Sequence, residues 1–207
     1  MKNLNFILIM VLGFTTGFGV NAQEPGSEES VNYQDRHPIF DYSETVLNSI
    51  DSVPDFNSKS NPLKITGTVY MSDGMTPAQN VILYITQSDE HGQYQLKNKA
   101  DKRYVFHQAW VKTQADGSYT FYTFVPGKER RSNTLKRIHL AIKTPTGMVV
   151  QANDLVFDND PLLRKSCRKK LAKKGFDSIL KLEKKGNISV ARKNIILDKS
   201  VMQIAQN

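Results

Sequence analysis

The feature that most constrains the fold is a succession of short strand patterns between Pro62 and Leu197. In each pattern apolar residues either alternate with polar ones or form a short apolar run, and turn residues separate the patterns. The patterns lie at residues 63–69, 81–85, 104–112, 119–124, 137–143, 148–157, 178–182 and 188–197. Many short strands at roughly ten-residue spacing are typical of sandwiches and barrels. The sequence therefore predicts an all-β fold, either a sandwich or a barrel, with one or two short helices.

Local patterns add detail to this fold. Residues 161–174 contain good helix formers on a basic background, and Gly175 follows as a C-terminal cap. The apolar side chains within residues 41–51 have the spacing of a short amphipathic helix that docks on a larger body. The tetrapeptide Ala-Asp-Gly-Ser at 115–118 predicts a β-hairpin.

The N-terminus has the three parts of a secretory signal peptide. Lys2 supplies a positive charge, residues 6–12 are continuously apolar, and small residues precede Gln23. The apolar run is too short for a good transmembrane span. We predict cleavage near Ala22, export to the periplasm or the extracellular space, and no transmembrane anchor.

The rest of the chain divides into three predicted parts after the signal peptide at 1–22. Residues 23–61 are polar and aperiodic over most of their length, which indicates a disordered linker with the short helix inside it. The compact β-sandwich domain is expected at 62–198, and a tail follows at 199–207. Cys167 is the chain's single cysteine, so no intramolecular disulfide can form.

The positive charge is concentrated in one segment. The net charge is +8, and seven Lys and Arg residues lie between Arg164 and Lys174. Such a segment is either a solvated helix face or a contact for an acidic glycan, a lipid head group or a nucleic acid. No aromatic side chain stands among these residues for base stacking, and export removes cytoplasmic partners, so a nucleic acid is disfavoured. The predicted macromolecular partner is an envelope glycan or protein.

Four motifs occur in a fixed order along the domain. They are T-G-T-V-Y-x-x-D-G at 66–74, Q-x-D-x-x-G-x-Y at 87–94, D-G-x-Y-x-F-x-T-x-x-P-G at 116–127 and F-D-N-D-P at 157–161. Together they resemble the intradiol aromatic ring-cleavage dioxygenases of the protocatechuate and catechol type, over about residues 63–197. The D-G-x-Y-x-F fragment also occurs in transthyretin-like and other extracellular modules. The resemblance narrows the expected all-β fold to an antiparallel β-sandwich of the prealbumin-like type. It also implies a catechol-type substrate, and Fe(III) held by two tyrosinates and two histidines.

This chain matches only two of the four ligand positions that the resemblance implies. Tyr94 falls on the first tyrosine, whereas Glu129 stands at the second. Arg137 and His139 fall on the two histidines. An alignment shifted by two residues makes His139 the first histidine and Ala141 the second, so one histidine remains in either case. The arginine expected to assist the reacting ring is Thr134 here.

Other residues could complete a metal site. The candidate ligands are Tyr94, Glu129 and His139, with His107 as a further candidate. A histidine and carboxylate set would favour Fe(II) or another divalent metal over ferric phenolate chemistry. Arg137 argues against a metal site, because its guanidinium would repel a metal cation unless the arginine side chain points away from the site.

Two functions follow from these residues. The first is an exported, iron-dependent dioxygenase that opens a catechol-type aromatic ring. The second is a catalytically inert binding module of the cell envelope that has kept the sandwich and lost the metal site. No catalytic residue is assigned on the sequence.

Overall fold

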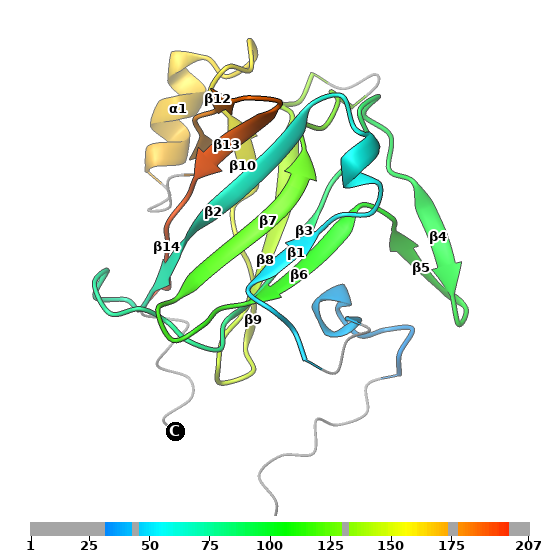
Figure 1. The fold of residues 1–207 in the computed structure, drawn as a ribbon, viewed down its shortest axis with the longest axis vertical. Helices are drawn as coiled ribbons and strands as arrows, with labels where there is room; N and C mark the ends of the chain where they lie inside the picture. Colours follow the sequence, from blue (N-terminus) through cyan, green and yellow to red (C-terminus); the bar gives the residue numbers. More distant parts are fainter. Residues whose placement is uncertain (1–31, 43–45, 130–132, 174–177, 199–207) are drawn as a thin grey trace, which may run out of the picture.

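The computed structural model describes residues 32–42, 46–129, 133–173 and 178–198. The expected signal peptide, the expected tail and Gly175 lie outside these residues. The described part is mostly β-structure, built from two packed sheets with one short α-helix at one end (Figure 1). This confirms the predicted all-β sandwich.

The first sheet is built on β2 (Pro62–Tyr70) and β7 (Ser118–Phe124), which pair antiparallel along most of their length. Its order is β1-β7-β2-β13-β12, with β14 also paired to β2. The added strands are β1 (Ile50–Ser52), β12 (Glu183–Lys185), β13 (Ile188–Arg192) and β14 (Ile195–Ile196). The segments β13 and β14 run parallel to β2, so the sheet is not purely antiparallel.

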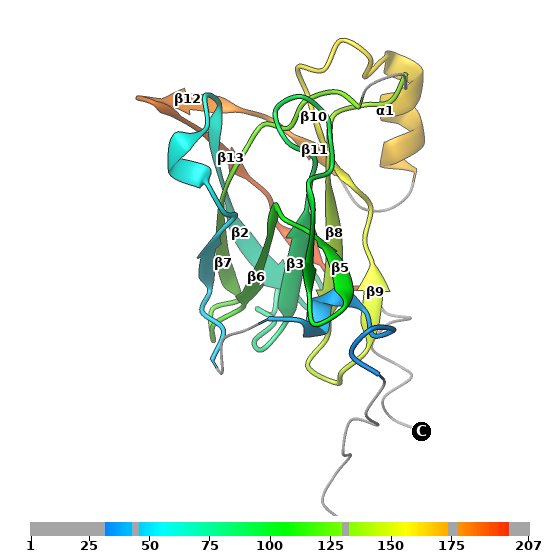
Figure 2. The ribbon, with the colours of Figure 1, turned by 90° about the vertical axis from the view of Figure 1, so that its right-hand side faces the viewer.

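The second sheet is centred on β3 (Ile82–Thr86), which lies between β6 (Gln108–Lys112) and β8 (Arg137–Lys143). Its order is β11-β10-β8-β3-β6, with β9 also paired to β8. The remaining strands are β9 (Val149–Gln151), β10 (Leu155–Phe157) and β11 (Ile179–Leu180). Strands β4 (Leu96–Lys99) and β5 (Lys102–Val105) form a separate antiparallel hairpin beside this sheet (Figure 2).

The core lies between the two sheets because alternate side chains of each strand point inward. In β2, every second residue is buried, as the sequence pattern predicts. The largest fully buried side chains include Phe121 and Phe124 of β7 and Leu83 and Ile85 of β3. Each such side chain stabilises the fold by about 1.5–3 kcal/mol through burial.

The predicted hairpin at 115–118 is wrong. The turn forms, with Gly117 at φ 70°, but β6 and β7 belong to different sheets and do not pair. Thr113 redirects the chain, because its buried hydroxyl donates to the Ala78 carbonyl at 2.7 Å and accepts from the Val81 N–H at 3.0 Å. The single strand expected at 104–112 is likewise divided into β5 and β6.

Most of the expected linker is folded where the structure describes it. The helix expected at 41–51 does not form over residues 46–51, since Ile50–Ser52 are strand β1, paired parallel with β7. Two 3₁₀ turns, η1 (Pro38–Phe40) and η2 (Phe56–Ser58), flank that strand. Ile39 and Val53 of this segment are buried, whereas Val46 and Ile50 are exposed. The structure of the segment therefore depends on tertiary contacts that local periodicity does not report.

The basic segment forms the predicted helix, α1 (Lys165–Ala172). Arg168 is held by the Asp158 carboxylate, and its Nη2 donates to the Asp158 carbonyl at 2.7 Å. Cys167 is a half-buried free thiol on this helix. Among the described residues, no helix is long and apolar enough to cross a membrane.

Candidate functional site

The outer face of the second sheet carries the candidate site. Tyr84 and Thr86 of β3 stand opposite Ala141 and His139 of β8 in the antiparallel register. Their neighbours Leu83 and Ile85 fill the core, so the period of two places these four residues on the other face of the sheet. The sheet therefore forms a floor from which His139 projects away from the core.

A cavity of about 520 Å³ lies over this floor. Its walls come from the β4–β5 hairpin, from residues 37–38 and from the end of β9. The lining residues are His37, Pro38, Tyr84, Thr86, Leu96, Arg103, Tyr104, Val105, His139, Ala141, Gln151 and Asp154. Apolar and aromatic walls with a few polar groups, in this size range, are typical of small-molecule sites.

The Q-x-D-x-x-G-x-Y motif forms the loop that delivers Tyr94 to the site. Gln87 is fully buried, accepts a hydrogen bond from Thr123 Oγ1 at 2.6 Å and donates to the Phe124 carbonyl at 3.0 Å. The Asp89 carboxylate accepts from the N–H groups of His91 and Gln93. Burial acts to raise the pKa of Asp89, but these hydrogen bonds outweigh it and hold the pKa below its usual range.

Two glycines bring the Tyr94 loop against the Glu129 loop. Gly92 has φ +77°, and a Cβ atom built there would lie 1.9 Å from the Lys128 carbonyl oxygen. A Cβ atom on Gly127 would lie 2.4 Å from the Glu90 carbonyl oxygen, and the Gly127 N–H donates to the Asp89 carbonyl at 2.8 Å. Only residues without a side chain permit this approach. The motif glycines thus set the distance between Tyr94 and Glu129.

A hydrogen-bonded chain joins Tyr94, His139 and Asp154. The Tyr94 hydroxyl lies 2.7 Å from His139 Nε2, and His139 Nδ1 lies 2.8 Å from Asp154 Oδ1. Burial and the charge of Glu129 raise the pKa of Tyr94 to about 12, so the phenol is neutral near pH 7. The ionised Asp154 carboxylate can only accept, so His139 Nδ1 carries a proton and donates it to Asp154, while the Tyr94 hydroxyl lies within hydrogen-bond distance of Nε2.

Arg137 lies between the two carboxylates of the site. Its Nη1 is 3.3 Å from Asp154 Oδ2, and its Nε is 3.9 Å from Glu129 Oε1. The Glu129 carboxylate is also 3.5 Å from the Tyr94 hydroxyl. Burial opposes ionisation of Asp154, but the bonds from His139 and Arg137 outweigh it and lower the Asp154 pKa. The five side chains form one network with a fixed cation inside it.

These residues do not fit the ferric site that the resemblance implies. Tyr94, Glu129 and His139 lie close together, but Arg137 lies with them and carries a permanent positive charge. The guanidinium neutralises the carboxylates that would otherwise balance a metal ion. No group of three or more His, Cys, Asp or Glu residues in the described part is arranged to hold a metal.

Two other residues differ from expectation. His107, a further candidate ligand, is fully buried against Phe106 and Phe124 and does not line the cavity. Burial lowers its pKa, so it is a neutral core residue. Asp154 was missed by sequence reasoning, although it is the carboxylate that orients His139. The only signal in the sequence is a carboxylate just before the apolar residues of β10.

Comparison with solved structures identifies the fold. The chain is similar to the dioxygenase domain of a dioxygenase and carbohydrate-binding fusion from Streptomyces sp. SirexAA-E, with 22% identity and a TM-score of 0.56, over 76% of this chain and 92% of that one. An intradiol ring-cleavage dioxygenase from Tetranychus urticae matches with 19% identity and a TM-score of 0.56, over 76% and 89% of the two chains.

A third match is a 3-chlorocatechol 1,2-dioxygenase from Rhodococcus opacus 1CP, with 19% identity and a TM-score of 0.54, over 76% and 69%. No protein-family model and no curated protein matches the chain. This chain has the β-sandwich fold of the intradiol ring-cleavage dioxygenases, with different residues at two of the four positions where the sequence resemblance implies iron ligands.

Proposed function

We propose that this protein is an exported binding protein for a small aromatic compound, and that it acts without iron. The observation that carries the proposal is Arg137, whose guanidinium lies among Tyr94, Glu129, His139 and Asp154 in place of a metal-binding group. The chain would thus be the envelope binding module that the sequence left open as its second function. Export near Ala22 and contact of the Arg164 to Lys174 segment with an envelope glycan or protein remain part of the proposal.

The cavity supports an aromatic ligand. The lining includes the aromatic residues Tyr84 and Tyr104 and the aliphatic residues Leu96 and Val105, and the volume of about 520 Å³ accommodates a single ring with substituents. Polar groups stand at its edges, among them His139 and the Arg103 guanidinium. A phenol would bury its ring against the apolar walls and place its hydroxyl groups on these polar side chains.

The test combines ligand titration with metal analysis. We expect the purified wild-type protein to bind 4-nitrocatechol, followed by its visible absorption, and to consume no oxygen with it. Replacing Tyr104 by Ala should weaken binding about tenfold, which corresponds to ~1.4 kcal/mol. The control Tyr122→Ala lies on the other sheet, outside the cavity lining, and should leave the affinity unchanged.

Ring cleavage by an iron centre is the competing function, supported by the fold and by the convergence of Tyr94, Glu129 and His139. Stoichiometric iron in the purified protein, a visible tyrosinate-to-iron absorption band and oxygen uptake with catechol would establish it and overturn the proposal. Failure of 4-nitrocatechol and catechol to bind at millimolar concentration would overturn the aromatic-binding proposal as well.

A further inference from the structure

Segment 32–42 is the least expected part of the cavity. The sequence indicates a disordered linker there, yet the structure packs η1 onto the outer face of the second sheet. Ile39 is fully buried in a second small core with Ile82, Tyr84 and Ala141. The neighbouring His37 and Pro38 form one wall of the cavity.

A second wall is the β4–β5 hairpin, which belongs to neither sheet of the sandwich. It contributes Leu96, Arg103, Tyr104 and Val105 to the cavity lining. Tyr94 lies only two residues before β4, so the base of this hairpin also carries the tyrosine of the Tyr94–His139–Asp154 chain. Two peripheral segments therefore border the cavity above the floor that the second sheet forms.

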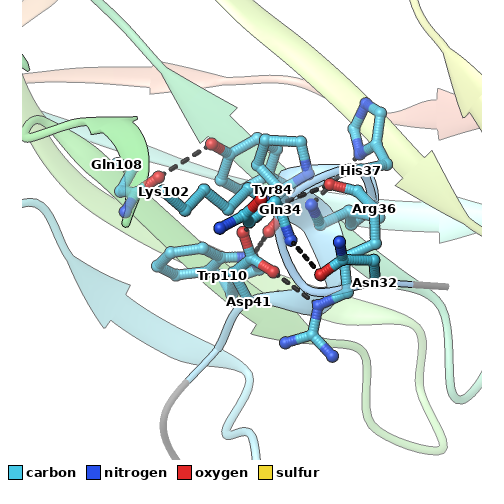
Figure 3. Close-up of polar contacts among 11 residues, drawn as sticks. Asn32, Gln34, Arg36, His37, Asp41, Tyr84, Lys102, Gln108 and Trp110 are labelled. Atoms are coloured by element: carbon cyan, nitrogen blue, oxygen red, sulfur yellow. Dashed lines mark hydrogen bonds and ion pairs between the residues drawn. The ribbon is translucent and has the colours of Figure 1, made fainter. Parts of the chain in front are cut away.

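One buried ion pair connects these two walls. Lys102, the first residue of β5, lies 2.6 Å from Asp41 Oδ2, and both side chains are under one-tenth exposed. The same ammonium donates to the Arg36 carbonyl at 2.7 Å, and Arg36 Nε is 2.7 Å from the other Asp41 oxygen. Figure 3 shows Asp41 between Arg36 and Lys102, beside the Trp110 indole, which donates to the Pro38 carbonyl at 3.2 Å.

We propose that Asp41 and Lys102 form a latch that positions segment 32–42 and the β4–β5 hairpin together, so that both close on the ligand and His37 contacts it. A buried ion pair is sensitive to loss of one partner, because the other charge is left without compensation in a poorly solvated place. Loss of the latch should therefore release both walls rather than one. The inference that the walls close on a ligand rests on the proposed binding function.

His37 has the geometry of a ligand-contacting donor. Its Nδ1 accepts a hydrogen bond from the Ile39 N–H at 3.1 Å, so the neutral ring carries its proton on Nε2. The ring lies edge-on to Tyr84, with centroids 6.2 Å apart, at the margin of the cavity. An N–H group at that margin suits a phenolic or other oxygen acceptor on an aromatic ligand.

Hydrogen exchange of the full chain tests the latch without any ligand. In Lys102→Met, amides of both β4–β5 and segment 32–42 should exchange about tenfold faster, while β2 and β7 keep their protection. Lys99→Met changes an exposed lysine of the same hairpin, paired across from Lys102, and should change nothing. Asp41→Asn, which removes the other charge, should reproduce the Lys102→Met pattern. Faster exchange confined to one wall would overturn the coupling.

Ligand affinity distinguishes the positioning role of the latch from the direct contact that His37 makes with the ligand. His37→Leu should weaken 4-nitrocatechol binding about fivefold to tenfold with unchanged exchange of the hairpin, whereas Lys102→Met should change both. Lys102→Arg keeps the charge and should recover most of the affinity. If wild-type protein binds and these variants bind equally well, the latch has no role in the site. If wild-type protein does not bind 4-nitrocatechol, the proposed function fails. The exchange experiment still decides whether segment 32–42 and the β4–β5 hairpin are coupled.

Discussion

Replacing Gly92 by Ala should destabilise the protein by about 3 kcal/mol or more and separate Tyr94 from its partners. The backbone at Gly92 has φ +77°, which costs a non-glycine residue about 1–2 kcal/mol. The added Cβ would also lie 1.9 Å from the Lys128 carbonyl oxygen, a contact with main chain that a side-chain rotation cannot relieve. The two loops must therefore move apart.

Gly147→Ala is the matched control for this effect. Gly147 has φ +88°, but a Cβ there would meet no atom within 4 Å. The Gly147→Ala variant should lose only the stability that backbone strain costs, about 1–2 kcal/mol, which corresponds to a fall in Tm of roughly 2–8 °C. Thermal unfolding of both variants measures the difference in their stability losses. Ligand affinity shows whether the Tyr94 loop has moved. Equal losses in the two variants would show that the contact between the loops is unimportant.

The second large effect concerns Asp154. We expect Asp154→Asn to cost about 1–2 kcal/mol near pH 7, because it removes the anion that accepts from His139 and pairs with Arg137. This range is at the low end for charged hydrogen bonds, since the carboxylate is about one-quarter exposed and partly screened. Urea unfolding of wild-type and variant protein measures the loss.

The pH dependence of this loss has a definite sign. The folded-state pKa of Asp154 is lowered, so its contribution is fully present above the unfolded value of about 3.9. The contribution disappears as the pH falls through the lower, folded-state pKa. The stabilities of wild-type protein and Asp154→Asn should therefore converge in acid.

Asp158→Asn provides the comparison for Asp154→Asn. It removes a more exposed carboxylate, which pairs with Arg168 of α1, and should change stability by less than about 1 kcal/mol. A difference between wild-type protein and Asp154→Asn that persisted unchanged below pH 3 would contradict the role given to this carboxylate.

Much of the sandwich was predictable because its strands follow a simple rule. In β2 and β7 the alternation of apolar and polar residues matches the alternation of buried and exposed faces. The basic helix was predictable for a similar reason, since its residues favour helix locally. The order of the motifs indicated the fold, which the similarity to solved structures supports, and it singled out Tyr94, Glu129 and His139 as candidates for one site.

Other features depended on which surfaces the fold leaves open. Ile50–Ser52 became a strand because the edge of β7 was unpaired and offered backbone hydrogen bonds. The turn at Gly117 did not make a hairpin, because Thr113 directs β6 into the second sheet. Neither outcome is encoded in a local window of sequence.

By itself, the sequence determined the all-β class, the motifs that carry Tyr94 and His139, and the replacement of two expected ligands by Glu129 and Arg137. Only the tertiary structure decided that Arg137 joins Glu129 and Asp154, that Asp154 orients His139, and that residues 37–38 wall the cavity. The physical reason is that side-chain type and periodicity are local properties. Ion pairing and cavity formation depend on distances between segments that lie far apart along the chain.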